Sequence, residues 1–170
     1  MQRETELENI LIGFNKVEMI LFMNTHPEVF EEAVELAISN KQSYSWRAAW
    51  LLSLCMKEND KRIQKHTKKI INSINDKNDG HQRELIKILL KIDLKNKYEG
   101  ILFYICVTIW EQINKKPSVR FTAFKFIVKS AKKHPELFDE LTFFTQKHFL
   151  ETLSPGIRKS IYKIIKEISN

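Results

Sequence analysis

The sequence predicts an all-α protein, a right-handed α-α superhelix of about four helix pairs behind one N-terminal helix. Gly and Pro number only four each among 170 residues, which favours helices with short connections. A short pattern, an arginine followed by a mostly apolar helical run, recurs at Arg47, Arg83, Arg120 and Arg158. The spacings of 36, 37 and 38 residues between these arginines are typical of a helical repeat array.

The N-terminal helix is expected over about residues 4–23, where apolar residues recur with the period of a helix. Its predicted inward stripe comprises Leu7, Ile10, Leu11, Phe14, Val17 and Leu21. Gly13 weakens this helix and indicates a bend. His26-Pro27-Glu28 ends the helix and starts the next one, because proline fits the first helical position.

The helix that begins near Trp46 is apolar nearly all round, as expected of an inner helix with neighbours on two sides. Ser43 or Ser45 is expected to cap its N-terminus. Trp46, Trp50 and Trp110 all lie in apolar runs. This setting favours core positions over platforms on which nucleic-acid bases would stack.

The remaining elements follow the same alternation of helix and short turn. Residues 61–75 carry isoleucines on one face and lysines on much of the rest, and Asn75–Gly80 is a clear turn. Residues 100–113 form a very apolar helix. A second His-Pro-Glu, at residues 134–136, lies 108 residues after the first, which equals three periods of 36. Ser154-Pro155-Gly156 is expected to cap the last helix.

The chain is expected to be a single domain over residues 1–170. A capping helix at 1–24 precedes four helix-pair repeats, at 25–58, 59–94, 95–133 and 134–170. No single pair can bury its apolar side alone, so neighbouring pairs must stack into one continuous core. This is the organisation of a solenoid.

The repeated stretches resemble HEAT-like (armadillo-type) helical repeats, whose second helices tend to open with an apolar-Arg pair. The matching stretches are Trp46-Arg47-Ala48-Ala49, Gln82-Arg83-Glu84-Leu85, Val119-Arg120-Phe121-Thr122-Ala123 and Ile157-Arg158-Lys159-Ser160-Ile161. Gln82 departs from the apolar member of the pair. The resemblance covers about residues 24–168 and implies a fold far more than a function.

In HEAT-type proteins this arginine often pairs with an aspartate from a turn. The residues four positions before the arginines are Ser43, Asp79, Lys116 and Ser154, so only one offers a carboxylate. We therefore expect Arg47, Arg83, Arg120 and Arg158 to be structural and to bond carbonyl groups at helix ends. A ligand-binding role for the four arginines is the alternative.

No motif for catalysis, cofactor binding or metal binding occurs in the sequence. GxGxxG, GxxxxGK[ST], GxSxG and HExxH are all missing, and none of the five histidines has a second histidine or a cysteine at i+3 or i+4. The sequence therefore predicts a protein that is not an enzyme and that uses no cofactor and no metal.

Charge is unevenly distributed along the chain. Residues 1–60 hold 10 acids and 5 bases, whereas residues 61–170 hold 11 acids and 23 bases. Lysines recur at similar offsets from the arginines, at Lys87, Lys91, Lys125, Lys129, Lys163 and Lys166. On aligned second helices these lysines would form a basic stripe that can track phosphates. The alternative is an ordinary solvated helix surface.

The predicted function is a non-catalytic scaffold that binds a protein partner. The second hypothesis is nucleic-acid binding through the lysine stripe, and the resemblance suggests a comparison with HEAT-like DNA glycosylases. Two lone cysteines favour a reducing compartment, and the longest apolar run, Ile101–Trp110, is too short for a bilayer. The charged N-terminal stretch also lacks the apolar segment of a secretory signal. We therefore expect a cytoplasmic protein with no membrane contact.

Overall fold

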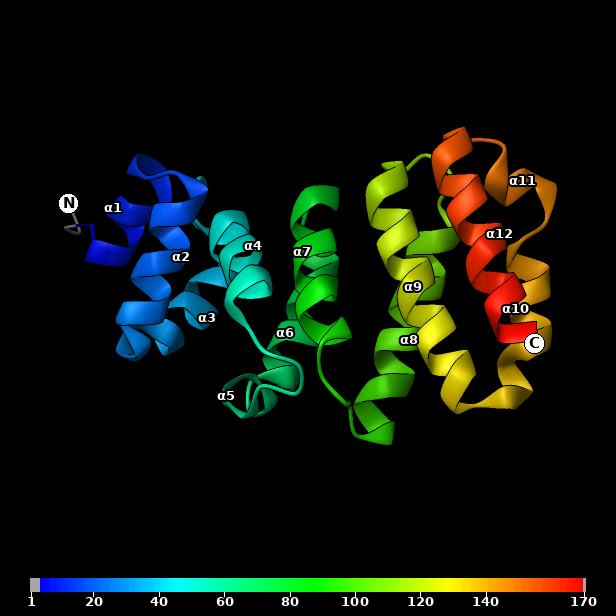
Figure 1. Cartoon of the computed structure of the whole chain (residues 1–170), viewed down its shortest axis with the longest axis horizontal. Coiled ribbons are helices and arrows are strands. Elements are labelled where there is room, and N and C mark those ends of the chain that lie inside the picture. The colour runs from blue at the N-terminus through cyan, green and yellow to red at the C-terminus, as the bar shows by residue number, and fades with distance from the viewer. Residues whose placement is uncertain (1–3, 170) are drawn as a thin grey trace. The chain divides into compact units, whose positions relative to one another are not determined.

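A computed structural model describes residues 4–169 of the chain. In these residues it contains twelve α-helices, three short 3-10 helices and no β-strand, so the all-α prediction is confirmed (Figure 1). The chain divides into two compact units, and unit 1 ends at Leu94 while unit 2 begins at Lys95. This division coincides with one expected repeat boundary; the other repeat boundaries stay predictions.

Unit 1 is built from seven α-helices and two 3-10 turns within its described residues. They are α1 (Glu6–Gly13), α2 (Lys16–Thr25), η1 (Pro27–Val29), α3 (Phe30–Ile38), α4 (Ser45–Cys55), α5 (Lys61–Gln64), α6 (Thr67–Ser73), η2 (Ile74–Asp76) and α7 (Asp79–Leu90). The predicted segment 61–75 is thus divided among α5, α6 and η2. Its isoleucines Ile63, Ile70, Ile71 and Ile74 are nevertheless buried, at most 1% exposed.

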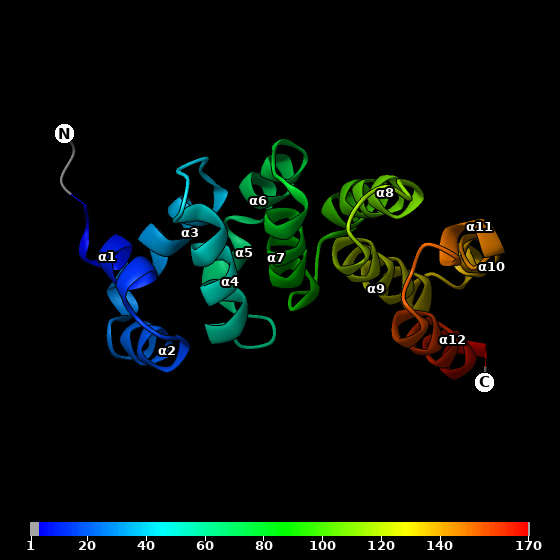
Figure 2. The ribbon, with the colours of Figure 1, turned by 90° about the horizontal axis from the view of Figure 1, so that it is seen from above.

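Helix α4 is the central helix of unit 1 and contacts α2, α3 and α7 (Figure 2). Ala48 and Ala49 are at most 1% exposed, and their small side chains allow neighbouring helices to approach closely. Helix α6 fills the remaining side by packing on α3 and α7. The expected inner helix is therefore present.

The N-terminal helix expected as one piece is broken in two, at Phe14 and Asn15. The Asn15 side chain accepts hydrogen bonds from the backbone N–H groups of Val17 and Glu18, and the Glu18 carboxylate accepts one from the Asn15 N–H. This capping box starts a new helix. The new direction leaves Val17 74% and Leu21 61% exposed, so their predicted inward positions are wrong.

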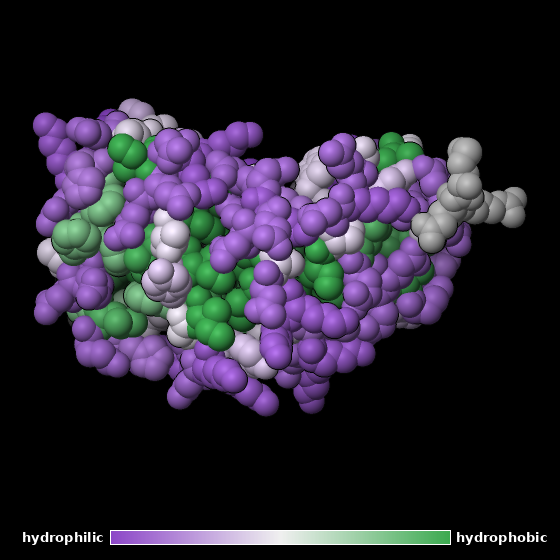
Figure 3. Space-filling view, turned by 180° about the vertical axis from the view of Figure 1, so that it is seen from behind, coloured by the Kyte–Doolittle hydropathy of each residue, from purple (hydrophilic) through white to green (hydrophobic). Residues whose placement is uncertain are grey.

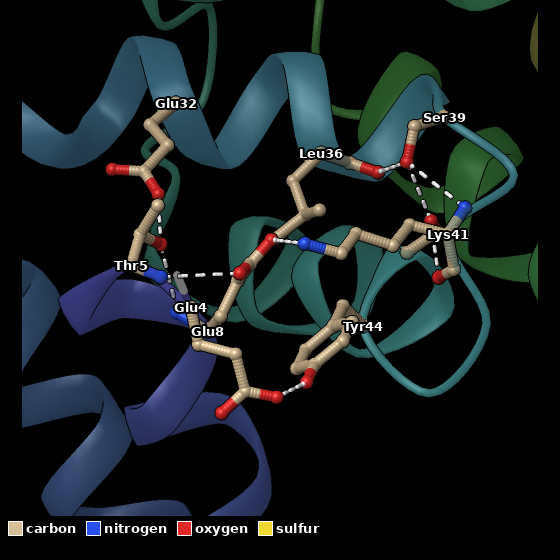
Figure 4. Close-up of polar contacts among 9 residues, drawn as sticks. Glu4, Thr5, Glu8, Glu32, Leu36, Ser39, Lys41 and Tyr44 are labelled. Carbon is tan, nitrogen blue, oxygen red and sulfur yellow. Dashed lines mark hydrogen bonds and ion pairs between the residues drawn. The ribbon is translucent and has the colours of Figure 1, made fainter. Parts of the chain in front are cut away.

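The loop between α3 and α4 is tied to the start of α1 (Figure 4). The Lys41 ammonium donates to the Glu8 carboxylate, and this hydrogen bond lowers the pKa of Glu8. The Tyr44 hydroxyl donates to Glu4, and its bond to that carboxylate raises the pKa of Tyr44 to about 12. Thr5 links the same turn to Glu32 of α3. These polar contacts therefore hold the start of α1 against the α3–α4 loop and against α3.

The predicted serine cap of α4 is wrong. Ser43 adopts a left-handed backbone conformation with φ of 71°, and Ser45 is already the first helical residue. The Ser45 hydroxyl instead donates to the Lys41 carbonyl at 2.8 Å. The cap position belongs to Tyr44, whose side chain makes no capping bond.

Unit 2 contains five α-helices and one 3-10 turn within its described residues. They are α8 (Asn96–Glu111), α9 (Pro117–Lys133), η3 (Pro135–Leu137), α10 (Phe138–Phe144), α11 (Lys147–Leu150) and α12 (Pro155–Ser169). Helices α8 and α9 form the main pair, and both α10 and α12 pack on α9. Helix α9 is therefore the central helix of this unit.

An aromatic cluster forms much of the core of unit 2. The Trp110 ring lies 4.7 Å from Phe124 and 6.2 Å from Phe149, centroid to centroid. The indole N–H of Trp110 donates to the carbonyl oxygen of Phe144 at 3.1 Å. Packing and a polar anchor thus hold α8 against α10 and α11.

The two His-Pro-Glu segments adopt the same local structure. His26 has φ of −124° and ψ of 69°, and His134 has φ of −125° and ψ of 85°. Each proline then opens a 3-10 turn, and an α-helix follows it directly. Both His-Pro-Glu segments therefore start a helix, as expected. The first turn of each is a 3-10 turn, which is tighter than an α-helical turn.

Candidate interaction surfaces

The excess of positive charge lies entirely in unit 2. Residues 1–94 contain 14 bases and 14 acids, and residues 95–170 contain 14 bases and 7 acids, so unit 2 carries the whole net charge of +7. Within unit 1, whose numbers of acids and bases are equal, acids of α3 pair with bases of the following repeat. Glu31 contacts Lys65 at 2.7 Å, and Glu35 contacts Lys69 at 2.7 Å. The charge asymmetry seen along the sequence is therefore cancelled within unit 1.

Of the six candidate lysines, Lys87 lies in α7 and Lys91 directly follows that helix, and both bind groups of unit 1. The Lys87 ammonium lies 3.2 Å from each carboxylate oxygen of Glu84. The Lys91 ammonium donates to the Met56 carbonyl at 3.1 Å. These contacts give both lysines a local partner in the fold.

The other four candidate lysines belong to α9 and α12, which contact each other in unit 2 (Figures 1 and 2). Lys125 is exposed and its ammonium lies 4.5 Å from the centre of the Phe121 ring, while Lys129 is half-buried. Lys163 lies 4.0 Å from Glu167, and Lys166 is exposed. Unit 2 thus places four candidate lysines on two helices that contact each other.

Arg120 is fully buried and reaches three acceptors. Its Nε donates to the Trp110 carbonyl at 3.0 Å, and Nη2 donates to the Phe149 carbonyl at 2.8 Å. Its Nη1 donates to the Thr152 hydroxyl at 2.8 Å. Burial lowers the pKa of Arg120 from its usual high value. The guanidinium therefore ties the ends of α8 and α11 to the central helix.

The other repeat arginines occupy three different settings. Arg47 donates to the Leu11 carbonyl in the last turn of α1 and lies 5.5 Å from the Trp46 ring. Arg83 donates to Glu84 at 2.7 Å. Arg158 is half-buried. Arg47 and Arg120 thus bond carbonyls near helix ends, whereas Arg83 pairs with the acid that follows it.

Glu84 is a buried carboxylate that the sequence pattern did not single out. Its side chain is 0% exposed and binds Arg83 and Lys87, and the Ser53 hydroxyl of α4 donates to it at 3.4 Å. Two cations compensate its charge, as a buried carboxylate requires. In the sequence, the only sign of this role is that Arg83 lies one position before Glu84 and Lys87 lies three positions after it.

Exposed apolar residues occur in both units, and two groups of them lie on or beside a single helix. In unit 1, Phe14, Val17 and Leu21 are 46%, 74% and 61% exposed and lie on or just before α2. In unit 2, Ile101 and Tyr104 of α8 are 42% and 73% exposed. Figure 3 shows hydrophobic side chains on the face of unit 2 seen from behind. Both groups offer surface that a partner can bury.

The sequence predicts core positions for all three tryptophans, but the structure exposes them to different degrees. Trp110 is fully buried, Trp50 is half-buried, and Trp46 is 43% exposed. The core prediction is therefore wrong for Trp46. It lies in the first turn of α4, where it lines a surface cavity instead of the core.

Unit 1 has a polar cavity of about 410 Å³ between the α3–α4 loop and the start of α7. Lys77 and His81 line it, and both are at least nine-tenths buried. The Lys77 ammonium donates to the Ser39 carbonyl at 2.9 Å, and burial lowers its pKa. His81 Nε2 lies 2.6 Å from the Ala37 carbonyl, and burial lowers the pKa of this histidine. The cavity walls are thus partly made of groups that bind the end of α3.

Within residues 4–169, no three side chains of His, Cys, Asp or Glu gather closely enough to hold a metal ion. No helix of the described chain has both the length and the apolar character needed to cross a bilayer.

Replacing Arg120 by methionine should lower the free energy of unfolding of unit 2 by about 3 kcal/mol or more. The change leaves the Trp110 and Phe149 carbonyls buried without a donor, and each lost partner costs about 1–3 kcal/mol. Urea unfolding followed by far-ultraviolet circular dichroism measures the loss. Arg158→Met is the matched control and should cost less than about 1 kcal/mol. Equal losses for the two variants would contradict the anchoring role of Arg120.

Stability of unit 1 should fall as pH drops from about 6.5 toward 5, because His81 has a depressed pKa when folded and an ordinary pKa of about 6.5 when unfolded. The unfolded chain then binds more protons, at a cost of at most about 1.4 kcal/mol per pH unit. Urea unfolding followed through NMR cross-peaks of α7 measures this slope. His81→Gln, which can still donate to Ala37, should flatten the slope, while His148→Gln in unit 2 should not change it. An unchanged slope in His81→Gln would refute the assignment.

Comparison with known proteins places the chain in one family. No curated protein and no solved structure matches the chain. The family model described as HEAT repeat domain matches residues 5–168, which is nearly the whole chain. The chain therefore belongs to the HEAT repeat domain family.

Proposed function

We propose that the chain is a non-catalytic scaffold that binds a protein partner. The observation that carries this proposal is the apolar stripe formed by Val17 and Leu21 on α2, with Phe14 exposed in the break just before that helix. These apolar side chains are 46–74% exposed. HEAT repeats commonly mediate protein interactions, which supports the same function.

The stripe has the features of a helix-packing surface. Val17 and Leu21 are four residues apart on α2, so their side chains lie on the same face of the helix. Fully burying a side chain of this size contributes about 1.5–3 kcal/mol. A partner that covers this face gains that energy without reordering α2, since the capping box at Asn15 already fixes the helix start.

We also propose that the protein resides in a reducing compartment, the cytoplasm. Cys55 is half-buried in α4 and Cys106 is buried in α8, and both are free thiols. Burial raises the pKa of both thiols and so disfavours the reactive thiolate. Unpaired buried thiols suit a compartment that keeps cysteine reduced.

Val17→Glu combined with Leu21→Glu should weaken partner binding by at least about tenfold, because both side chains lose their burial in the complex. A partner is first isolated by co-purification with the wild-type chain, and its dissociation constant is then measured with purified proteins by calorimetry. Asn9→Glu combined with Asn72→Glu adds the same charge at exposed polar positions and should bind like wild type. Equal affinity of the apolar-stripe variant and wild type would exclude this stripe as the binding surface.

Nucleic-acid binding is the second candidate function, and the charge of unit 2 favours it. Unit 2 holds the whole net charge of +7, and its lysines on α9 and α12 belong to helices that contact each other. Lysines on neighbouring helices can contact successive phosphates, and such binding weakens steeply as salt rises. An apolar partner surface instead responds weakly to salt.

Fluorescence anisotropy with labelled DNA and RNA tests the second candidate at several salt concentrations. If α9 and α12 bind phosphates, Lys125→Glu combined with Lys166→Glu should reduce the slope of log affinity against log salt by about two. Lys57→Glu combined with Lys68→Glu changes the charge equally in unit 1 and should keep the slope. No binding at low salt, or equal slopes for both variants, would rule out this surface.

A further inference from the structure

We propose that the partner of the apolar stripe on α2 is helix α12 of a second copy of this chain. This inference rests on the proposed function and names the partner of that same surface. Each copy then carries two different binding surfaces, α2 with the break before it in unit 1 and α12 in unit 2.

The α2 surface is apolar and open to solvent. Val17 and Leu21 are 74% and 61% exposed and lie four residues apart on one face of the helix. Ile12 near the end of α1 and Phe14 just after that helix are 47% and 46% exposed. In a helical array the next repeat normally covers such a face, and a repeat without a neighbour needs a polar outer face. The α2 surface is therefore of the kind that another helix of an array covers.

Helix α12 offers a second apolar surface, which unit 2 covers only in part. Five isoleucines follow the helical period along one face of this helix: Ile157, Ile161, Ile164, Ile165 and Ile168. Ile161 is 0% exposed, whereas the other four are half-buried. Helix α12 packs on α9, and this arrangement leaves part of the isoleucine face accessible to another chain.

The two surfaces have the spacing needed for helix packing. Val17 and Leu21 form a short ridge with a spacing of four residues on α2. Ile164 and Ile168 form a ridge with the same spacing on α12. Ridges of this spacing interdigitate in the commonest class of helix crossing. Helix α2 has 10 residues and α12 has 15, so each is at least about 15 Å long and can form such a crossing.

Charge decides which of these surfaces attract each other. Residues 4–25, which contain α1 and α2, hold four acids and one base, a balance of −3. Residues 155–169, which form α12, hold four bases and one acid, a balance of +3. Lys41 compensates one of the acids, Glu8, whereas Glu6 and Glu18 are exposed. A contact between α2 and α12 joins opposite charges, while α2 against α2 or α12 against α12 would bring like charges together.

A contact between two different surfaces of one chain can repeat from copy to copy. Each copy can bind one neighbour through α2 and another through α12. A contact of one surface with itself would instead stop at a dimer. We therefore expect complexes larger than a dimer at high protein concentration.

Sedimentation velocity of the purified chain, freed of nucleic acid and studied from about 1 to 500 µM, measures this self-association. We expect dimers and larger species, with weaker association at high salt, because salt screens the attraction between the two surfaces. Lys163→Glu combined with Lys166→Glu should weaken the association by about fivefold or more. Lys97→Glu combined with Lys132→Glu is the matched control, since it changes the charge of unit 2 equally at exposed positions outside α12. A chain that stays monomeric throughout, or equal weakening by the two variants, overturns the proposal.

A mixing experiment identifies the two surfaces. Val17→Glu combined with Leu21→Glu blocks the α2 surface, and Ile164→Glu combined with Ile168→Glu blocks the α12 surface. Each variant alone should be monomeric, and their equimolar mixture should form a dimer and nothing larger, because one pair of intact surfaces remains. If the α12 variant dimerises alone, α2 binds α2, and if the α2 variant dimerises alone, α12 binds α12. Either result overturns the proposal.

Two controls keep this test decisive. Ile164 and Ile168 are half-buried, so circular dichroism must show that their variant keeps its helix content. If it does not, the variant of the exposed Lys163 and Lys166 replaces it, and its mixture with the α2 variant should associate with wild-type affinity. A chain that never self-associates, but whose α2 variant loses a co-purified partner, overturns this inference and leaves the proposed function intact. An α2 variant that self-associates like wild type and also keeps that partner overturns both.

Discussion

The carbonyl groups at the ends of the stacked helices are the constraint that shapes both units. The last carbonyls of a helix have no partner within that helix, and inside a stack they are shielded from water. In this protein, side chains from a neighbouring segment supply the donors: Arg47 to Leu11, His81 to Ala37, Lys77 to Ser39, Lys91 to Met56, Trp110 to Phe144 and Arg120 to Phe149. Within each unit, successive helix pairs are thereby joined by hydrogen bonds as well as by apolar packing.

Carbonyls and carboxylates of the fold together bind several of the basic residues of unit 1. Lys77 and Lys91 bind carbonyls, Lys87 binds the buried Glu84, and Lys69 pairs with Glu35 at a separation of 34 residues. A count of lysines along the sequence therefore overstates the positive surface of this unit. In unit 2 only seven acids accompany 14 bases, so the same demands leave an excess of positive charge.

The sequence predicted the helices well and the environment of individual side chains less well. The helical period, the prolines at helix starts and the spacing of the arginines are patterns of residue type and position. Such patterns can be recognised in the sequence without the structure. Whether Val17 or Trp46 is buried depends on whether another helix packs on its side of the helix. The spacing of apolar residues along the sequence does not contain this information. The break at Asn15 was predictable, since Asn15 and Glu18 form a capping-box pattern that the apolar period had obscured. The partners of Lys87 and Lys91 follow only from the three-dimensional arrangement.

Buried polar side chains are satisfied to different degrees in the two units. In unit 1 the buried Glu84 and His81 have partners at hydrogen-bonding distance. In unit 2 the buried Trp110 and Arg120 also have partners, but the Ser130 hydroxyl of α9 is buried without one. A buried hydroxyl without a partner costs about 1–3 kcal/mol, so this position lowers the stability of the helix on which α8, α10 and α12 pack.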